Sequence, residues 1–332
     1  MDSSEFEPGR YPEAPFVPPD RPPPKPPSYF DRERNNIILS CLLLVVTFAT
    51  CTLAGYGWDL QYRLAATGQL DFPAELFVNP LIVLRGIPFA VALLFILLCH
   101  EMGHFLTCRQ YGIYSTPPIP IPFPSFPGIL QTFGTLGAFI KIKAMFRNRR
   151  ELFDVGIMGP ICGMAAAIPV FLLGMKLSTT SAYSPEGEVL FFGDSLLTYL
   201  GARMFFPDVS PDSIALHPLG WAAWFGFLAT SLNLLPIGQL DGGHTAYAVL
   251  GRRGHLAVSI GVFAGLILLT VWSWPTPTYL VFAVVLLFLK LNHPPTLNDE
   301  ADIGRGRKWL ALLVLVIFLL TFIPVPVRVE YF

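Results

Sequence analysis

Charged residues are scarce in this sequence. Asp, Glu, Lys and Arg make up 14% of its 332 residues, whereas a typical soluble domain carries about 25%. Apolar residues make up 53%, which is more than one buried core requires and indicates that lipid is the solvent. The net charge of −1 leaves no basic excess, so we expect no nucleic-acid partner.

Regularly spaced cysteines are also absent. The five cysteines form no C-x-x-C pair and lie in or beside apolar runs. This pattern excludes a disulfide framework and a cysteine zinc site, and indicates small buried side chains.

Residues 1–34 differ from the rest of the chain. They contain "PEAPFVPPDRPPPKPPSYF", which is too rich in proline for a helix or a packed core, so we expect a disordered cytoplasmic tail. The tail is either merely solvated or a ligand for a partner domain with an aromatic groove. Its acidic, proline-broken start does not resemble a signal peptide, and the lack of a transit peptide favours a bacterial inner membrane.

Seven apolar runs follow the tail, and they predict an all-α polytopic membrane protein with six to seven transmembrane helices. The sixth run is short and is expected to be partly interfacial. The runs cover residues 37–56, 81–107, 152–175, 218–235, 256–274, 279–289 and 309–323.

Loop charges alternate along these runs. The segment between the second and third runs is basic, whereas residues 177–217 are mainly acidic. By the positive-inside rule the N-terminus is cytoplasmic and the C-terminus lies on the opposite side.

The second run contains three titratable residues in the motif HEMGH, which begins at His100 and ends at His104. Helical residues four apart lie on one face, so both imidazoles can bind one metal ion. Zinc suits two imidazoles, a third protein ligand and a water molecule. Glu101 lies on the same side and is the candidate base for that water. A polar cluster without metal is the less favoured alternative, because ionisable residues inside a membrane usually mark function.

A zinc site requires a third protein ligand at the same depth in the bilayer as His104. The fourth run ends in "NLLPIGQLDGGH", where Asp241 follows the helix-breaking Pro236. By spacing alone, Asp241 is equally well explained as a metal ligand and as part of an Asp-Gly-Gly turn. Asp154, at the start of the third run, is the second candidate.

The combination of these motifs resembles the site-2 protease family of intramembrane zinc metalloproteases, also called peptidase family M50. The resemblance covers residues 80–255 and the compact members that lack a PDZ domain. It implies one Zn²⁺ per chain on His100, His104 and Asp241, with Glu101 as general base and Asn233 binding substrate backbone or the oxyanion. The second motif, N-x-x-P-x-x-x-L-D-G, is matched by Asn233, Pro236, Leu240, Asp241 and Gly242.

The resemblance also implies a membrane-associated β-hairpin or re-entrant loop beside the active site. Residues 135–142 mix glycine with β-formers, and a strand edge there could pair with an unwound substrate. An ordinary interfacial loop anchored by Lys141 and Lys143 is the alternative.

These observations predict three regions: the tail at 1–34, a metalloprotease core at 35–255 and additional C-terminal transmembrane helices at 256–332. The expected function is cleavage of transmembrane segments of membrane-protein substrates, that is, regulated intramembrane proteolysis in a lipid bilayer. A non-catalytic scaffold that binds membrane helices is the alternative. A metal transporter is disfavoured, because the other runs offer almost no polar ligands.

Overall fold

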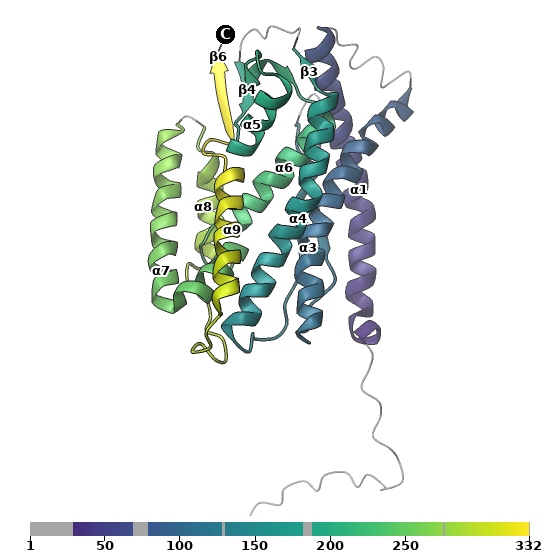
Figure 1. Cartoon of the computed structure of the whole chain (residues 1–332). Helices are drawn as coiled ribbons and strands as arrows, with labels where there is room; N and C mark the ends of the chain where they lie inside the picture. Colours follow the sequence, from purple (N-terminus) through teal and green to yellow (C-terminus); the bar gives the residue numbers. More distant parts are fainter. Residues whose placement is uncertain (1–28, 69–78, 128–129, 182–187, 275, 332) are drawn as a thin grey trace, which may run out of the picture.

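The computed structural model describes residues 29–68, 79–127, 130–181, 188–274 and 276–331, so most of the predicted tail at 1–34 lies outside it. The described chain is mostly helical, as predicted (Figure 1). Its α-helices are α1 (Tyr29–Thr67), α3 (Ile87–Gln110), α4 (Arg149–Leu177), α5 (Leu196–Phe205), α6 (Pro218–Asn233), α7 (Asp241–Trp272), α8 (Thr278–Leu289) and α9 (Arg305–Thr321). Two 3₁₀ turns, η1 (Pro80–Gly86) and η2 (Pro211–Ser213), complete the helical elements.

Four helices of the described chain are long and apolar enough to cross a membrane. These are Glu33–Thr67, Pro80–Gln110, Arg149–Leu177 and Asp241–Trp272. The predicted count of six to seven spans is not confirmed, because α6, α8 and α9 have 16, 12 and 17 residues. A full crossing takes about 20 residues, and the chain turns before these helices reach that length.

Helix α7 begins earlier than the apolar pattern indicates. Its first residue is Asp241, whereas the fifth predicted span starts at residue 256. Gly251 interrupts the helix with φ = 71° and ψ = −179°, a backbone conformation that residues with a Cβ rarely adopt. The first turns of α7 are therefore a separate short segment that presents Asp241 to the interior.

Helices α3, α4 and α6 pack together in the centre of the bundle. Ile96, Phe171 and Phe227 lie in their shared apolar core. The backbones of α3 and α4 approach very closely, because a Cβ at Gly103 would lie only 2.4 Å from the carbonyl oxygen of Met158. Small residues at such contacts are typical of membrane helix pairs.

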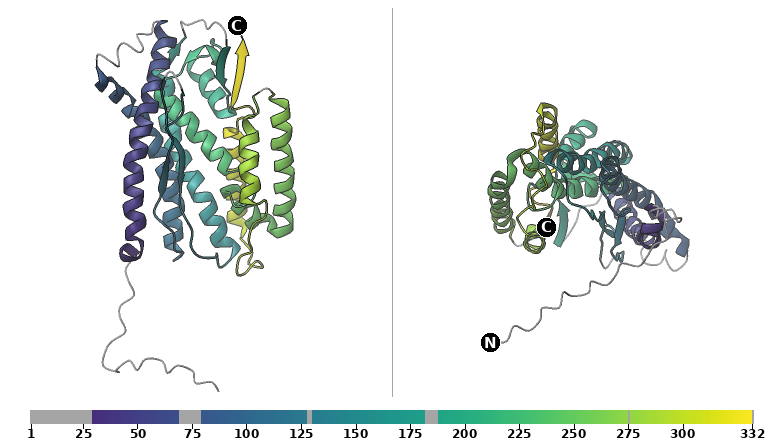
Figure 2. Two further views of the ribbon diagram at one scale, coloured as in Figure 1. Left: turned by 180° about the vertical axis from the view of Figure 1, so that it is seen from behind. Right: turned by 90° about the horizontal axis from the view of Figure 1, so that it is seen from below.

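Strands β1 (Ile119–Pro122) and β2 (Thr135–Phe139) form an antiparallel pair beside α1. Ile119 lies opposite Phe139, and the register is irregular between Pro120 and Pro122. Figure 2 shows this segment from behind, running along the bundle between α1 and the other helices. Its association with a membrane stays a prediction.

The remaining strands gather with α5 at one end of the bundle, opposite the end where α1 begins (Figure 1). We call the end with these strands the outer end, and the end where α1 begins the inner end. β3 (Thr179–Thr180) pairs with β5 (Ile214–Ala215), and β4 (Glu188–Phe192) pairs with the C-terminal β6 (Val327–Tyr331). The stretch "EVLFFGDSLL", for which the sequence indicates no role, thus forms β4 and the start of α5.

Candidate metal centre

Three potential metal ligands converge inside the helical bundle. His100 and His104 lie on α3, and Asp241 is the first residue of α7. Asp241 Oδ2 lies 3.1 Å from His100 Nε2 and 3.2 Å from His104 Nε2. Among the described residues this is the one group of three or more His, Cys, Asp or Glu whose ligand atoms all lie within 4.8 Å of one another. The runner-up ligand, Asp154, is not part of it.

These distances fit a tetrahedral zinc ion. Nitrogen and oxygen ligands bind zinc at about 2.0–2.2 Å, so two ligand atoms of one tetrahedron lie about 3.3–3.6 Å apart. The separations from Asp241 Oδ2 to the two Nε2 atoms are close to that value. Two imidazoles and one carboxylate are a donor set that zinc accepts, and they leave a fourth position for water.

The imidazole of His104 is oriented by a backbone group. Its Nδ1 donates a hydrogen bond of 2.7 Å to the carbonyl oxygen of Val155 on α4. A proton held on Nδ1 leaves the lone pair on Nε2 free for a metal ion. The same Nε2 faces Asp241, so the tautomer and the direction of the ring both suit ligation.

Glycines on α4 make room for the two histidines. A Cβ at Gly159 would lie 2.0 Å from His104 Nε2, and a Cβ at Gly163 would lie 3.0 Å from His100 Nδ1. Glycines at these positions predict close helix packing beside the site, but the two histidines that they admit lie more than 50 positions away, so spacing does not identify them. These glycines contribute to the site by leaving free the space that the two imidazole rings occupy.

Asp241 is positioned by the chain between α6 and α7. The left-handed residue in that connection is Gly238, with φ = 57°. Gly242 and Gly243 are helical, and a Cβ at Gly242 would lie 1.9 Å from the carbonyl oxygen of Leu234. These glycines therefore let the first turn of α7 pack on the preceding connection, and an Asp-Gly-Gly turn does not form.

Glu101 and Asn233 lie beside the two histidines. Both line a cavity of about 200 Å³ together with His100, His104 and Asp241. Glu101 is buried, and Asn233 Nδ2 lies 3.4 Å from His100 Nε2. The structure thus gathers all five residues named by the sequence analysis around one cavity.

Strand β2 and the residues after it form one wall of this cavity, through Ala138, Phe139, Ile140 and Ile142. In the described chain β2 pairs only with β1, so its other edge has no partner strand. Lys143, expected to face an interface, donates to Glu33 of α1 at 2.7 Å. Tyr114 also donates to Glu33, so the segment is fastened to α1.

Asp154 has a structural partner instead of a metal. Arg307 of α9 contacts its two carboxylate oxygens at 2.7 and 2.6 Å, and Tyr111 donates to it as well. This bidentate pair joins α4 to α9. The carboxylate of Asp154 therefore links α4 to α9 and is not part of the metal centre.

Three further histidines lie near the metal centre. His244 lines the cavity, and its Nδ1 lies 2.7 Å from His293 Nε2. Spacing in the sequence indicates interfacial loop positions for His255 and His293, but both are buried. Burial lowers the pKa of His293 to about 4, so this residue is neutral at pH 7. His293 is 49 positions from its partner, and no local signal marks the contact.

Comparisons with known proteins show the family to which the chain is related. Residues 88–271 match the family model for peptidase family M50. Over 246 residues, the chain is 30% identical to "Probable zinc metalloprotease EGY1, chloroplastic" of Arabidopsis thaliana, which covers 72% of this chain and 43% of that protein. The EGY1 protein of Oryza sativa subsp. japonica is 29% identical over 310 residues, 86% of this chain and 50% of that protein. The chain thus spans about half the length of these relatives.

The names of these relatives also bear on the location. Both relatives are named chloroplastic. They give no support to the bacterial inner membrane that the N-terminal sequence favoured.

Proposed function

The chain belongs to peptidase family M50, and from this premise we propose that it is a zinc metalloendopeptidase that cleaves transmembrane segments of membrane proteins. The observation that carries the proposal is the convergence of His100, His104 and Asp241 beside Glu101 within a bundle of apolar helices. A polar site at this depth is costly unless a metal ion and water compensate for the lost hydration.

We assign the roles of the residues as follows. His100, His104 and Asp241 would hold one zinc ion. When bound, zinc supplies Lewis-acid chemistry and lowers the pKa of a water molecule to about 7. Glu101 accepts the proton of the attacking water and transfers it to the nitrogen of the leaving amine. The amide of Asn233 donates a hydrogen bond to the substrate carbonyl oxygen or to a neighbouring backbone group.

The wall formed by β2 supports an extended substrate. A peptide bond inside a helix is shielded by its own hydrogen bonds, so the substrate must unwind before attack. Ala138 and Phe139 of β2 line the cavity, and in the described chain β2 has no second partner strand, so its free edge can pair with the unwound backbone. We propose that this edge holds the substrate beside Glu101.

The remaining proposals concern the surroundings. The lipid bilayer is the solvent of the apolar helices, with the inner end of the bundle on the cytoplasmic or equivalent side. The plastid origin of the named relatives makes a plastid membrane our first proposal, with a bacterial inner membrane second. The proline-rich tail is proposed as a partner-binding segment outside the core.

A combined measurement of zinc and cleavage tests the function. The full chain is purified in detergent and incubated with single-span helical peptides. We expect about one zinc per chain in wild type and in Glu101→Gln, with cleavage slowed at least about 100-fold in the variant. Glu300→Gln, which changes an exposed acid, is the matched control and should cleave normally. Asp241→Ala should lose zinc.

Each other outcome has a definite meaning. Cleavage by Glu101→Gln at the wild-type rate would contradict the mechanism. Zinc without cleavage of any peptide by wild type would favour the non-catalytic helix-binding scaffold. Absence of zinc in wild type would overturn the ligand assignment.

A further inference from the structure

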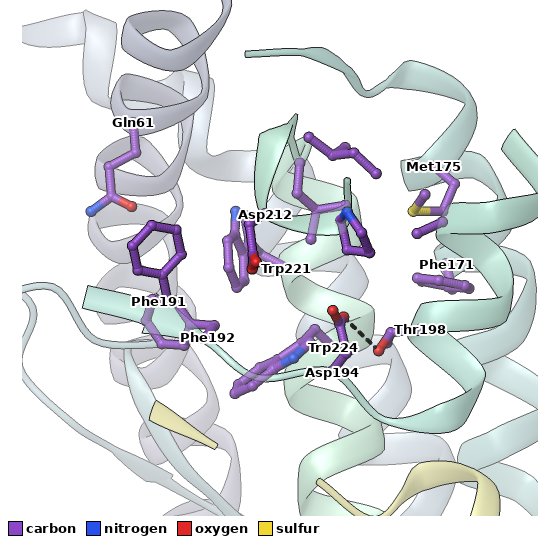
Figure 3. Close-up of a pocket in the computed structure, with 14 residues that line it drawn as sticks. Gln61, Phe171, Met175, Phe191, Phe192, Asp194, Thr198, Asp212, Trp221 and Trp224 are labelled. Atoms are coloured by element: carbon purple, nitrogen blue, oxygen red, sulfur yellow. Dashed lines mark hydrogen bonds between the residues drawn. The ribbon is translucent and has the colours of Figure 1, made fainter. Parts of the chain in front are cut away.

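A second cavity lies at the outer end of the bundle, away from the metal centre (Figure 3). Its volume is about 180 Å³, which is room for a small organic group. Helices α1, α4, α5 and α6 contribute to its walls, together with β4 and η2. The proposed peptidase chemistry uses none of its lining residues, and none of them lines the metal cavity.

Aromatic side chains form much of the wall. Phe191 and Phe192 come from β4, and Trp221 and Trp224 come from α6. The ring centroids of Phe192 and Trp221 are 4.8 Å apart, and Trp224 Nε1 donates to the carbonyl oxygen of Gly193 at 2.9 Å. These contacts fix the rings in place. Aromatic faces attract cations through their quadrupole.

Two carboxylates and no basic side chain line the same cavity. Asp212 Oδ2 pairs with Arg328 at 2.9 Å. Asp194 accepts a hydrogen bond of 2.9 Å from Thr198 (Figure 3), and in the described chain it forms no ion pair. Surrounding protein and the nearby charge of Asp212 raise the pKa of Asp194, whereas the hydrogen bond from Thr198 and the charge of Arg328 lower it in part. A cation in the cavity would offset the two effects that raise it.

Two lining residues, Asp212 and Phe191, already hold a guanidinium group. Arg328 of β6 pairs with Asp212, and its Cζ lies 5.5 Å from the centroid of the Phe191 ring. A cation is thus placed between a carboxylate and an aromatic face. Asp194, which is solvent-exposed, and the two tryptophans offer the same two kinds of contact elsewhere along the cavity.

We propose that this cavity binds an organic cation, an alkylammonium or guanidinium group, with its charge on Asp194 and its carbon atoms against Trp221 and Trp224. A hard divalent ion is a poorer fit, because Ca²⁺ and Mg²⁺ require several oxygen ligands, whereas aromatic rings form much of this wall. The proposal does not depend on the proposed peptidase activity.

Binding of n-butylammonium to the purified full chain tests the proposal, with n-butanol as the neutral analogue. Trp221 and Trp224 line the cavity, so tryptophan fluorescence reports occupancy and calorimetry gives the affinity. We expect saturable binding of the amine at millimolar concentration and none of the alcohol. Asp194→Asn should weaken binding at least about tenfold.

Two controls make the result decisive. Asp208→Asn changes an exposed acid of the same end that does not line the cavity, and should bind as wild type does. Zinc content reports folding of the distant core, and it should be equal in all three proteins. Equal binding of the alcohol, unchanged binding by Asp194→Asn, or no saturable binding of the amine by wild type would overturn the proposal.

A second arm identifies the source of the cation. The titration is repeated in phosphatidylglycerol vesicles with and without phosphatidylethanolamine, whose headgroup carries a primary ammonium. Competition by phosphatidylethanolamine would assign the site to a lipid headgroup. Unchanged amine binding in both vesicles would assign it to an amine taken from water.

Discussion

At the scale of single residues, the metal centre depends on the glycines of α4, which leave space for the histidines, as well as on the ligands. His104 can turn its Nε2 toward Asp241 because α4 has no side chain at Gly159. Val155, on the same helix, accepts from the opposite ring nitrogen. Helix α4 therefore accepts a hydrogen bond from one ring nitrogen, through Val155, and leaves space for the other, at Gly159. Helix α4 takes part in the site without contributing a ligand.

Gly159→Ala tests this arrangement. The added Cβ would lie 2.0 Å from His104 Nε2, so the ring must move away from Asp241. We expect zinc affinity to fall about 10- to 100-fold, as for loss of a group that orients a ligand. Competition with a zinc chelator measures the affinity.

The matched control is Gly261→Ala on α7, where a Cβ would have open space. It should bind zinc as tightly as wild type does. Tight binding by Gly159→Ala as well would show that the close contact has no effect on the ligand.

At the scale of elements, the β1–β2 segment is placed by its attachment to α1. Glu33 is buried and receives hydrogen bonds from Tyr114 and Lys143. These two donors flank the β1–β2 pair, whose strand β2 lines the metal cavity. The strand edge that we propose for substrate binding is therefore coupled to the inner end of α1.

Lys143→Met tests this coupling. It removes the ion pair with Glu33 and loosens the wall, while the zinc ligands stay in place. We expect cleavage of helical peptides to fall about tenfold, because small misplacements of a substrate slow its reaction strongly. Zinc content should not change.

Lys141→Met is the control for this substitution. Lys141 is an exposed residue of the same segment, and its replacement removes the same charge without touching Glu33. If both variants cleaved equally well, the attachment to α1 would have no part in catalysis.

At the scale of the whole molecule, the segment after α8 closes the inner end over the core. His293 contacts His244, and its ring centroid lies 4.5 Å from that of Tyr247. Tyr247 donates at 2.6 Å to Asp299. Arg307 then joins α9 to α4 through Asp154. C-terminal residues thereby stabilise the fold around the metal centre.

The stability of the molecule should depend on pH through His293. Burial lowers its pKa to about 4 in the folded chain, from 6.5 when it is solvated. The unfolded state therefore binds the proton first as the pH falls. Above pH 6.5 His293 is neutral in both states and its burial does not lower the free energy of unfolding. Between pH 6.5 and pH 4 the free energy of unfolding falls, by up to about 3 kcal/mol in total.

Denaturant unfolding of the metal-free chain at pH 7 and pH 5 measures this loss. His293→Gln cannot take up the proton, so its free energy of unfolding should change less between the two pH values than that of wild type. Because His244 and His255 interact with His293, the difference between the two proteins reports His293 together with its coupling to these neighbours. An identical pH dependence in both would assign the effect elsewhere.

The sequence by itself determined the features that depend on local spacing. Apolar composition predicts helices in lipid, and the interval from His100 to His104 places both rings on one helical face with Glu101 beside them. The match to peptidase family M50 confirms the resemblance stated from these motifs. Such patterns follow from helical periodicity, which acts over a few residues.

Only the tertiary structure decided the contacts between distant parts of the chain. Spacing left Asp241 and Asp154 as alternatives, and the fold brings the first to the histidines and pairs the second with Arg307, 153 positions away. The need for glycine at 159, the burial of His293 and the outer cavity likewise arise where separate helices meet. Helical periodicity carries no information about which faces meet, because that depends on how all the helices pack together.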